Sequence, residues 1–237
     1  MKTDRKKKNA SLGKNVASAF RLTLPVMAGY VFLGFAFGLL MRTKGFALWI
    51  PIVMSAAIYS GALEFAAVPV LSAAFDPLGS FFLGFLLSIR HLFYGIPMLK
   101  RYAKTGKSKP FLIFGLTDET FSILSTTAVP DGVQPTAFYF FVTLLDFLYW
   151  VSGTALGAAF GEIVTFNVDG LDFALTALFV VLFIEQISRK EGLKSGFIGL
   201  LASTAVRTLF GSEYFVLVSM AVILVILLAG KKVIVRE

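Results

Sequence analysis

The chain has 237 residues, of which 57% are hydrophobic and only 15% are charged, and these proportions exclude a soluble globular fold. A soluble domain carries about 25% charged residues, and so few charges could not cover a surface that faces water. Because the chain has no cysteine and one histidine, disulfides, thiolate metal sites, cysteine nucleophiles and clusters of histidine ligands are excluded as well.

The formal net charge of +8 is unevenly distributed along the chain. Eighteen of the 22 Lys and Arg residues lie in four short stretches, at 1–21, 100–109, 189–194 and 231–237. Basic stretches between apolar segments mark cytoplasmic loops beside anionic lipid headgroups, whereas a nucleic-acid site needs a continuous basic surface. We therefore predict contacts with membrane lipids, no binding of nucleic acid, and N- and C-termini in the cytoplasm.

Eight apolar segments follow one another along the chain, joined by short connections with turn signals such as Asp76-Pro77, Pro130-Asp131-Gly132 and Asp169-Gly170. The segments, numbered one to eight in chain order, are 22–41, 47–71, 77–99, 111–128, 136–160, 171–188, 193–210 and 214–229. None shows the two-residue alternation of a membrane barrel. The sequence therefore predicts an all-α membrane protein, a polytopic helical bundle with one transport domain at 22–230 between cytoplasmic tails at 1–21 and 231–237.

Eight simple crossings conflict with the charges, because they place the basic stretch 100–109 outside the cell. The conflict disappears if one of segments one to three enters and leaves on the same side, and one of segments five to seven does the same. The connections Val129–Pro135 and Gly211–Glu213, which have no Lys or Arg, then lie outside. Arg42 and Lys44 would also lie outside, against the general rule.

Charged positions recur at about half the chain length, which suggests two related halves of inverted topology, at 22–128 and 136–229. Transporters built from inverted repeats bind their substrate near the middle of the membrane, at broken helices. Segments two and six are the best candidates for broken or non-crossing elements. The recurring positions are Glu64 with Arg90 in the first half, and Glu185 with Arg207 in the second.

Charged side chains inside apolar segments need a partner or a polar cavity, because each costs ~2.5–3.5 kcal/mol at the centre of a membrane helix. Glu64 follows Ser60-Gly61, where glycine permits a break. It either neutralises a cationic group of the substrate, carries a proton, or pairs with Arg90. Arg90 either binds a carboxylate through its planar fork or extends to lipid headgroups. His91 either relays protons or caps a helix turn.

Asp118 and Glu119 stand side by side in segment four. Adjacent helical residues point about 100° apart, so at least one of the two faces the interior of the bundle. Two close carboxylates raise one another's proton affinity, which suits proton coupling, but acids also favour the start of a helix after a break at Gly115. Asp146 either contacts substrate or pairs with a basic residue, and structural roles are favoured for Glu185 and Arg207.

Five glycines in segments one and five recur at spacings that let helices pack closely, and packing is their favoured role. They are Gly29, Gly34, Gly38, Gly153 and Gly157.

Enzyme motifs are absent: the sequence has no Gly-x-Ser-x-Gly, no P-loop and no His-Glu-x-x-His. We therefore predict no enzymatic activity and no cofactor. Without a nucleotide site, active transport by this chain must draw on an ion or proton gradient, or on exchange.

Three stretches carry a resemblance to a known family: Tyr59–Ala66, Ser88–Tyr94 and Gly115–Phe121. The chain resembles the AzlC-like branched-chain amino-acid permease family, the larger subunit of two-component amino-acid exporters. The family commonly has Asn-Leu-Arg-His in the second stretch, where this chain has Ser88 and Ile89 before Arg90-His91. Many members carry Gln or Ser near the position of Glu64. The resemblance implies export of branched-chain or related apolar amino acids across the bacterial plasma membrane, with a small AzlD-like membrane protein as partner subunit.

Together these observations favour a gradient-coupled amino-acid exporter, with a passive channel or a non-transporting membrane scaffold as alternatives. In this hypothesis Arg90 meets the substrate carboxylate, and Glu64 or Asp118 meets the ammonium group, beside the helix break at Ser60-Gly61. His91 and Glu119 are the candidate proton relays. Phe65, Phe93 and Phe121 are expected to line an apolar pocket for the substrate side chain.

Overall fold

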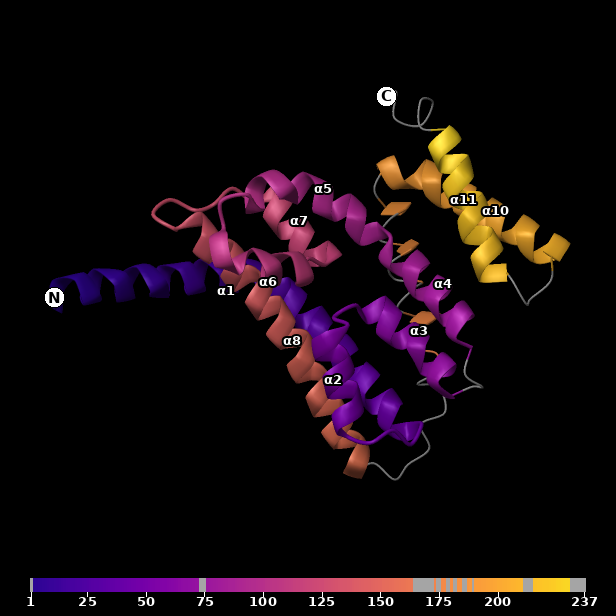
Figure 1. Ribbon diagram of the computed structural model, residues 1–237, viewed down its shortest axis with the longest axis horizontal. Coiled ribbons are helices and arrows are strands. Elements are labelled where there is room, and N and C mark those ends of the chain that lie inside the picture. Colours follow the sequence, from indigo (N-terminus) through magenta and orange to yellow (C-terminus); the bar gives the residue numbers. More distant parts are fainter. Residues whose placement is uncertain are drawn as a thin grey trace. The chain divides into compact units, whose positions relative to one another are not determined.

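The structure is a computed structural model that describes residues 2–72, 76–163, 190–210 and 215–230, with scattered positions between 173 and 188 (Figure 1). All of the elements in this part of the chain are helical, as the composition predicts. They are α1 (Lys2–Thr43), α2 (Trp49–Ala57), α3 (Gly61–Ser72), α4 (Pro77–Ser88), α5 (Arg90–Tyr102), the 3₁₀ turn η1 (Gly106–Ser108), α6 (Lys109–Phe114), α7 (Asp118–Thr126), α8 (Pro135–Ile163), α10 (Lys190–Phe210) and α11 (Phe215–Ala229).

The predicted number of eight segments is not confirmed. Among the described residues, two helices are long and apolar enough to cross a membrane, Gly13–Thr43 and Pro135–Ile163. The pair Pro77–Phe85 and Arg90–Tyr102 makes a third if it forms one span. Most of segment six, including Glu185, lies outside the described residues, as do the Asp169-Gly170 turn, the Gly211–Glu213 connection and the tail 231–237.

The chain forms two compact units, one of residues 1–75 and 87–171 and the other of residues 76–86 and 172–237. In the second unit, the guanidinium of Arg207 in α10 lies over the ring of Phe215 in α11, 5.9 Å from its centroid, which ties the two helices together. The first unit contains every candidate site residue. The predicted inverted repeats stay a prediction.

Helices α1 and α8 form the centre of the first unit and run in the same direction (Figure 1). Their backbones approach so closely that a Cβ on Gly34 would lie 2.7 Å from the carbonyl oxygen of Trp150, and one on Gly153 would lie 2.6 Å from that of Val31. Cβ atoms on Gly38 and Gly157 would overlap the backbone of the facing helix in the same way. The predicted packing role is confirmed for these four glycines.

The fifth glycine does not take part in this contact. A Cβ on Gly29 would meet nothing within 4 Å, so the packing prediction is wrong at this position. Gly29 lies on an exposed face of α1.

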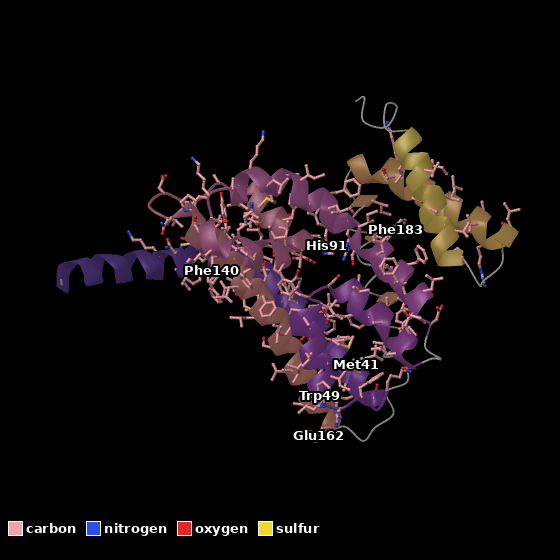
Figure 2. The ribbon with its side chains drawn as sticks, viewed as in Figure 1. Met41, Trp49, His91, Phe140, Glu162 and Phe183 are labelled. Atoms are coloured by element: carbon pink, nitrogen blue, oxygen red, sulfur yellow. The ribbon has the colours of Figure 1, made fainter. Side chains whose placement is uncertain are left out.

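The two ends of the α1–α8 pair are marked by polar contacts. At one end, the backbone N–H of Gln134 donates to Asn15 Oδ1 at 3.4 Å. At the other end, Arg42 lies 3.7 Å from Glu162, and Figure 2 labels Met41, Trp49 and Glu162 towards this end. We call these the Asn15 end and the Arg42 end.

Helix α5 reaches the Asn15 end, where Tyr102 joins a buried core with Ala19 of α1 and Phe138 of α8. The basic stretch 100–109 therefore lies at the same end as the N-terminal part of α1, which agrees with the prediction that both face one side. The connection Val129–Pro135 lies at this end as well, because Gln134 contacts Asn15. Its predicted place on the opposite side is wrong.

That correction has a structural cause, because segment four does not cross. It is broken at 115–117 into α6 and α7, and Gly115 at the break packs against the methyl group of Thr143 in α8. The start of α6 follows the basic stretch, and the end of α7 returns to the Asn15 end, where Arg101 donates to the carbonyl oxygen of Ser125 at 3.1 Å. Helices α6 and α7 thus form a re-entrant hairpin.

Segment two is also broken, as predicted, at 58–60 between α2 and α3. Helix α2 begins beside the Arg42 end, and α3 turns back towards that end, since Phe65 packs on Phe37 of α1 with ring centroids 5.4 Å apart. The turn requires a positive φ of 47° at Tyr59, a conformation that costs a non-glycine residue about 1–3 kcal/mol. Helices α2 and α3 therefore form a second re-entrant hairpin.

The two hairpins enter from opposite ends, and their tips meet inside the unit. The ring of Tyr59, at the tip of α2–α3, lies 6.0 Å from the ring of Phe114, at the tip of α6–α7. Both tips lie near Tyr30 and Trp150, whose rings are in edge contact at 5.6 Å about halfway along α1 and α8. The breaks in segments two and four therefore lie at the same level, about halfway along α1 and α8.

Candidate functional site

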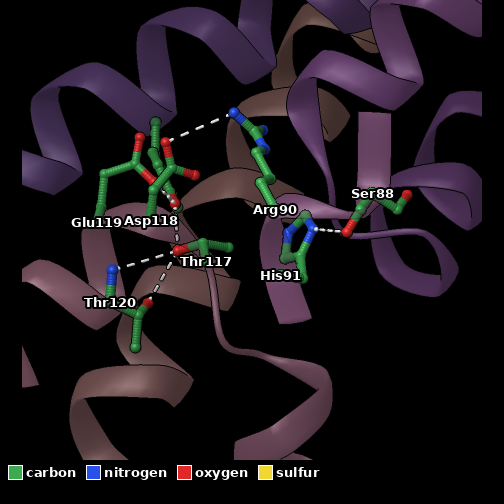
Figure 3. Close-up of polar contacts among 8 residues, drawn as sticks. Ser88, Arg90, His91, Thr117, Asp118, Glu119 and Thr120 are labelled. Carbon is green, nitrogen blue, oxygen red and sulfur yellow. Dashed lines mark hydrogen bonds and ion pairs between the residues drawn. The ribbon is translucent and has the colours of Figure 1, made fainter. Parts of the chain in front are cut away.

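The site lies where the hairpin tips meet the start of α5. Breaks expose backbone groups and bring polar side chains into an apolar interior, which is the arrangement that broken membrane helices provide. Figure 3 shows Arg90 of α5 extending towards Asp118 at the start of α7, where Thr117 and Glu119 also lie. 

Arg90 and Asp118 form the one close pair of opposite charges at this place among the described residues. The guanidinium Nη1 lies 3.8 Å from Asp118 Oδ2, and the two side chains are 33% and 29% exposed (Figure 3). This distance is longer than that of a direct charged hydrogen bond, about 2.7–2.9 Å. Arg90 Nε is buried and makes no hydrogen bond to any described residue. The guanidinium therefore has donors left for an anionic group.

The neighbouring His91 turns away from Asp118 and contacts Ser88 instead. Its Nδ1 is 3.1 Å from the carbonyl oxygen of Ser88, at the one-residue interruption between α4 and α5 (Figure 3). The imidazole also borders a cavity of about 360 Å³ between α5 and α6, whose wall is largely apolar. The structure does not bring His91 into contact with Glu119, the other predicted proton relay.

Tyr94 follows Arg90 by four residues and so lies on the same face of α5. Its ring stacks on Phe121 of α7, with centroids 5.2 Å apart and planes at 20°. The aromatic pair is therefore next to the Arg90–Asp118 pair, one helix turn along both α5 and α7.

The three residues predicted to line an apolar pocket do not come together. Phe121 lies beside Tyr94, whereas Phe65 is fully buried against Phe37 on α1 and Phe93 is 57% exposed. Of the three, Phe121 is the one placed near Arg90.

Glu64 is fully buried at the start of α3, and donors from two elements already contact its carboxylate. Trp150 Nε1 of α8 donates to both oxygens, at 3.0 and 3.1 Å, and the backbone N–H of Ser60 donates to Oε1 at 3.0 Å. Gly61 lies directly against the Trp150 ring, since a Cβ there would be 2.7 Å from a ring atom. In this conformation Glu64 fixes α3 to α8, and it does not pair with Arg90.

The Glu64–Trp150 contact gives a prediction for stability. Trp150→Phe should lower the free energy of unfolding by about 1–3 kcal/mol, because it leaves the buried Glu64 carboxyl without its side-chain donor. The same substitution in a Glu64→Gln background should cost less, since a neutral amide is cheaper to leave partly unpaired. The coupling is measured by unfolding the wild type, the two single variants and the double variant in detergent. Additive losses of stability would contradict the Glu64–Trp150 contact.

Glu119 is held by a side chain from α1. Tyr30 Oη lies 2.6 Å from Glu119 Oε2 and 2.7 Å from Thr117 Oγ1. Thr117 is the residue that caps α7, where its Oγ1 accepts from the backbone N–H of Thr120 at 3.2 Å. The two acids that follow therefore stand at the positive end of the α7 dipole.

Asp146 of α8 is connected to the same helix start. Thr120 Oγ1 donates to Asp146 Oδ2 at 2.7 Å, and both residues are fully buried. The other carboxylate oxygen, Oδ1, is buried and has no hydrogen-bond partner among the described residues. Neither a Lys nor an Arg side chain of the described chain pairs with it.

Six residues of this site were not among the predicted site residues: Tyr30, Tyr94, Thr117, Thr120, Asp146 and Trp150. The Thr-Asp-Glu-Thr sequence does contain a helix-capping signal that would have placed Thr117 and Thr120 at a helix start. Asp146 stands out as the one acid of segment five. For Tyr30 and Trp150 the sequence holds no comparable signal, because aromatic residues are frequent throughout the chain.

Comparison with known proteins places the chain in a family. Residues 25–164 match the family model described as AzlC protein. The chain is 48% identical over 215 residues, 91% of its length and 85% of the relative's, to a Bacillus subtilis protein named branched-chain amino acid transport protein AzlC.

Two further relatives are described only as uncharacterized membrane proteins. One, from Haemophilus influenzae, is 36% identical over 84% of this chain and 82% of its own. The other, from Helicobacter pylori, is 34% identical over 92% of this chain and 96% of its own. No solved structure matches the chain.

Proposed function

The chain belongs to the AzlC family of membrane transport proteins, and on this premise we propose that it exports branched-chain or related apolar amino acids across the bacterial plasma membrane. The function of the Bacillus relative, 48% identical over most of both chains, supports amino-acid transport. The direction of transport, the use of a gradient and the binding residues are proposed from the residues of the site.

Arg90 carries the assignment of the site. An amino acid must present its carboxylate to a cation inside the membrane, and a guanidinium matches a carboxylate with two parallel donors. Arg90 is a half-buried guanidinium at a helix break, loosely paired with Asp118 at 3.8 Å and with an unused buried Nε. A carboxylate placed on Arg90 would supply the acceptors that Asp118 does not.

Asp118 is the proposed partner of the substrate ammonium group. It lies beside Arg90 and is 29% exposed, so a ligand can reach it, whereas Glu64 is fully buried beneath Trp150 and Ser60. The separation of Arg90 and Asp118 allows one α-amino acid to contact both groups. The neighbouring Tyr94–Phe121 pair offers an aromatic surface to an apolar substrate side chain.

The orientation follows from the positions of the basic residues. The stretch 100–109 and the basic N-terminal part of α1 lie at the same end of the first unit, so this end faces the cytoplasm by the positive-inside rule. The Arg42 end faces outwards, which leaves Arg42 paired with Glu162 and Trp49 exposed at the outer interface. Export then moves substrate from the α6–α7 side towards the α2–α3 side.

Two further parts of the proposal concern what the chain works with. The sequence has no nucleotide-binding motif, so an ion or proton gradient, or exchange, is the proposed source of energy. A small AzlD-like membrane protein is the proposed second subunit. Large apolar side chains such as Leu92, Ile96 and Leu99 on α5 are exposed in this chain and need lipid or another subunit to cover them.

Flux measurements on proteoliposomes test this function. With the co-encoded small membrane protein present, labelled leucine should move in a saturable manner, valine and isoleucine should compete, and lysine and glutamate should not. A proton gradient across the vesicle membrane should change the rate of leucine flux. Flux that never saturates would indicate a passive channel, and absence of flux with or without the small protein would indicate a scaffold; either result would contradict the proposal.

A further inference from the structure

Three hydroxyl side chains connect two carboxyl groups that lie on different helices. From Glu119 Oε2 of α7, the series passes through Tyr30 Oη, Thr117 Oγ1 and Thr120 Oγ1 to Asp146 Oδ2 of α8. The four successive distances are 2.6, 2.7, 3.1 and 2.7 Å, all within the range of hydrogen bonds between oxygen atoms or close to it. We call this series the hydroxyl chain.

The number of protons in the hydroxyl chain is set by its chemistry. Each hydroxyl group carries one proton, so Tyr30, Thr117 and Thr120 supply three protons for the four oxygen–oxygen contacts. If both carboxylates were ionised, one pair of oxygen atoms would face each other at hydrogen-bond distance with only lone pairs between them. A fourth proton, on either Glu119 or Asp146, completes all four bonds. The backbone N–H that Thr117 accepts fills a lone pair and leaves this count unchanged.

Burial argues for the same extra proton. Thr120 and Asp146 are fully buried, and Tyr30 and Thr117 are each 7% exposed. Asp146 Oδ1 lies buried with no hydrogen-bond partner in the described part of the chain. A fixed negative charge with an unpaired oxygen inside a membrane protein is costly, and sharing a proton with Glu119 reduces that cost.

We propose that Glu119 and Asp146 share one proton and that the hydroxyl chain moves it between them during transport, which makes Asp146 the second proton-binding residue of the carrier. The inference rests on the proposed function for its role in transport. In one direction the Glu119 carboxyl gives its proton to Tyr30, and Tyr30, Thr117 and Thr120 each pass on their own. Asp146 receives the last proton, so one O–H bond is lost at Glu119, one is gained at Asp146, and all three hydroxyls are restored.

Other ionisable groups face the pair from each neighbouring element. Tyr59 at the tip of α2–α3 lies within electrostatic range of Asp146, Glu119 and Glu64. Arg90 of α5 and Asp118 of α7 act on Glu119. A substrate carboxylate arriving at Arg90 therefore changes the charge next to Glu119. The added negative charge favours the shared proton on Glu119 over Asp146. Substrate binding is thereby coupled to the position of the proton.

Infrared spectroscopy of the purified protein, with its small partner, tests the shared proton without transport. Glu119→Gln, Asp146→Asn and the double variant should each lose the same carbonyl-stretch intensity, that of one protonated carboxyl, because an amide N–H supplies the fourth proton in every case. Glu162→Gln, at an exposed ion pair, should lose none. Unchanged intensity in either single variant, or twice the loss in the double variant, would overturn the proposal.

Transport assays test the movement of the proton. Thr120→Val should lower proton-driven leucine flux by about tenfold or more, while leucine–leucine exchange at zero gradient stays within about threefold. Thr120→Ser should restore the driven flux. Thr154→Val removes a buried hydroxyl that is not part of the hydroxyl chain, and it should leave the driven flux unchanged. Tyr30→Phe breaks the chain at a second place and should behave as Thr120→Val does.

The outcomes separate this proposal from the function on which it rests. If the wild type exchanges no leucine, the proposed function fails, whatever the infrared result. If the wild type shows exchange and driven flux, and Thr120→Val and Tyr30→Phe keep the driven flux, the hydroxyl chain is wrong while the transport function stands. Thr120→Val that loses exchange as well is misfolded, and the decision then rests on Tyr30→Phe and the infrared intensities.

Discussion

Alanine in place of Arg90 should lower the rate of leucine transport about 100-fold or more. Removing a guanidinium that holds a carboxylate away from water costs about 2–5 kcal/mol, and each 1.4 kcal/mol is a factor of ten. The loss should be larger than that of any other single charged residue in the first unit, because Arg90 is the cation at the helix breaks and Asp118 would be left without its partner. Reconstituted flux of labelled leucine measures the effect.

Two variants show whether charge alone or the fork of donors is needed. Arg90→Lys keeps the positive charge but not the two parallel donors, so it should recover part of the rate and stay about tenfold below the wild type. Lys100→Ala removes an exposed cation from the same helix and should leave the rate within about twofold. Equal losses of transport rate in Arg90→Ala and Lys100→Ala would mean that the rate depends on the net charge of α5, and this would contradict a binding role for Arg90.

The second large effect concerns the α1–α8 contact. Gly38→Ala should reduce the free energy of unfolding by about 3 kcal/mol, because the added Cβ would overlap the backbone at Thr154 and Ala158, which cannot move aside as a flexible side chain can. For a chain of this length the melting temperature should fall by ~6–12 °C. Size-exclusion chromatography of heated, detergent-solubilised protein measures the shift.

Gly29→Ala is the matched control on the same helix. A Cβ at Gly29 meets nothing within 4 Å, and alanine is the better helix former, so the melting temperature should stay the same or rise slightly. A fall at both positions would show that α1 tolerates no change of glycine, and a fall at neither would contradict the close approach of the two helices.

Several features of the fold follow from the sequence because they depend on local chemistry. Long apolar runs predict helices, and glycines spaced by four residues in segments one and five predict the contact through Gly34, Gly38, Gly153 and Gly157. The basic stretch 100–109 predicts that its loop shares a side with the N-terminus, and α5 indeed ends beside Ala19. These predictions need only composition, spacing and the membrane as solvent.

Other features depend on tertiary partners that a single sequence does not show. Segment four is long and apolar enough to resemble a crossing, and the break at Gly115 with the cap at Thr117 was open to either interpretation. Its return to the Asn15 end is decided by contacts with α1 and α8, at Tyr30 and Thr143. The predicted re-entrant element among segments five to seven stays a prediction, since most of segment six lies outside the described residues.

The candidate site shows the same division. Because charge inside an apolar run is costly, the sequence indicates Arg90, Asp118 and Glu119, and the structure brings all three together at the start of α7. The same rule indicates Glu64, yet its carboxylate accepts from the indole N–H of Trp150, so the alternative of a pair with Arg90 is not what the structure shows. Which of two nearby donors a buried acid takes depends on the helix register, and α3 is turned by the break at Tyr59.

Recognition of the substrate carboxylate by Arg90 is tested most directly by competition with an uncharged analogue. In proteoliposomes carrying the wild type, unlabelled leucine should inhibit flux of labelled leucine about 100-fold more strongly than leucinamide, which keeps the side chain and the amino group but lacks the carboxylate. In Arg90→Gln this difference should nearly vanish, because the remaining amide cannot distinguish a carboxylate from an amide by charge. Equal inhibition of the wild type by leucine and leucinamide would contradict the account.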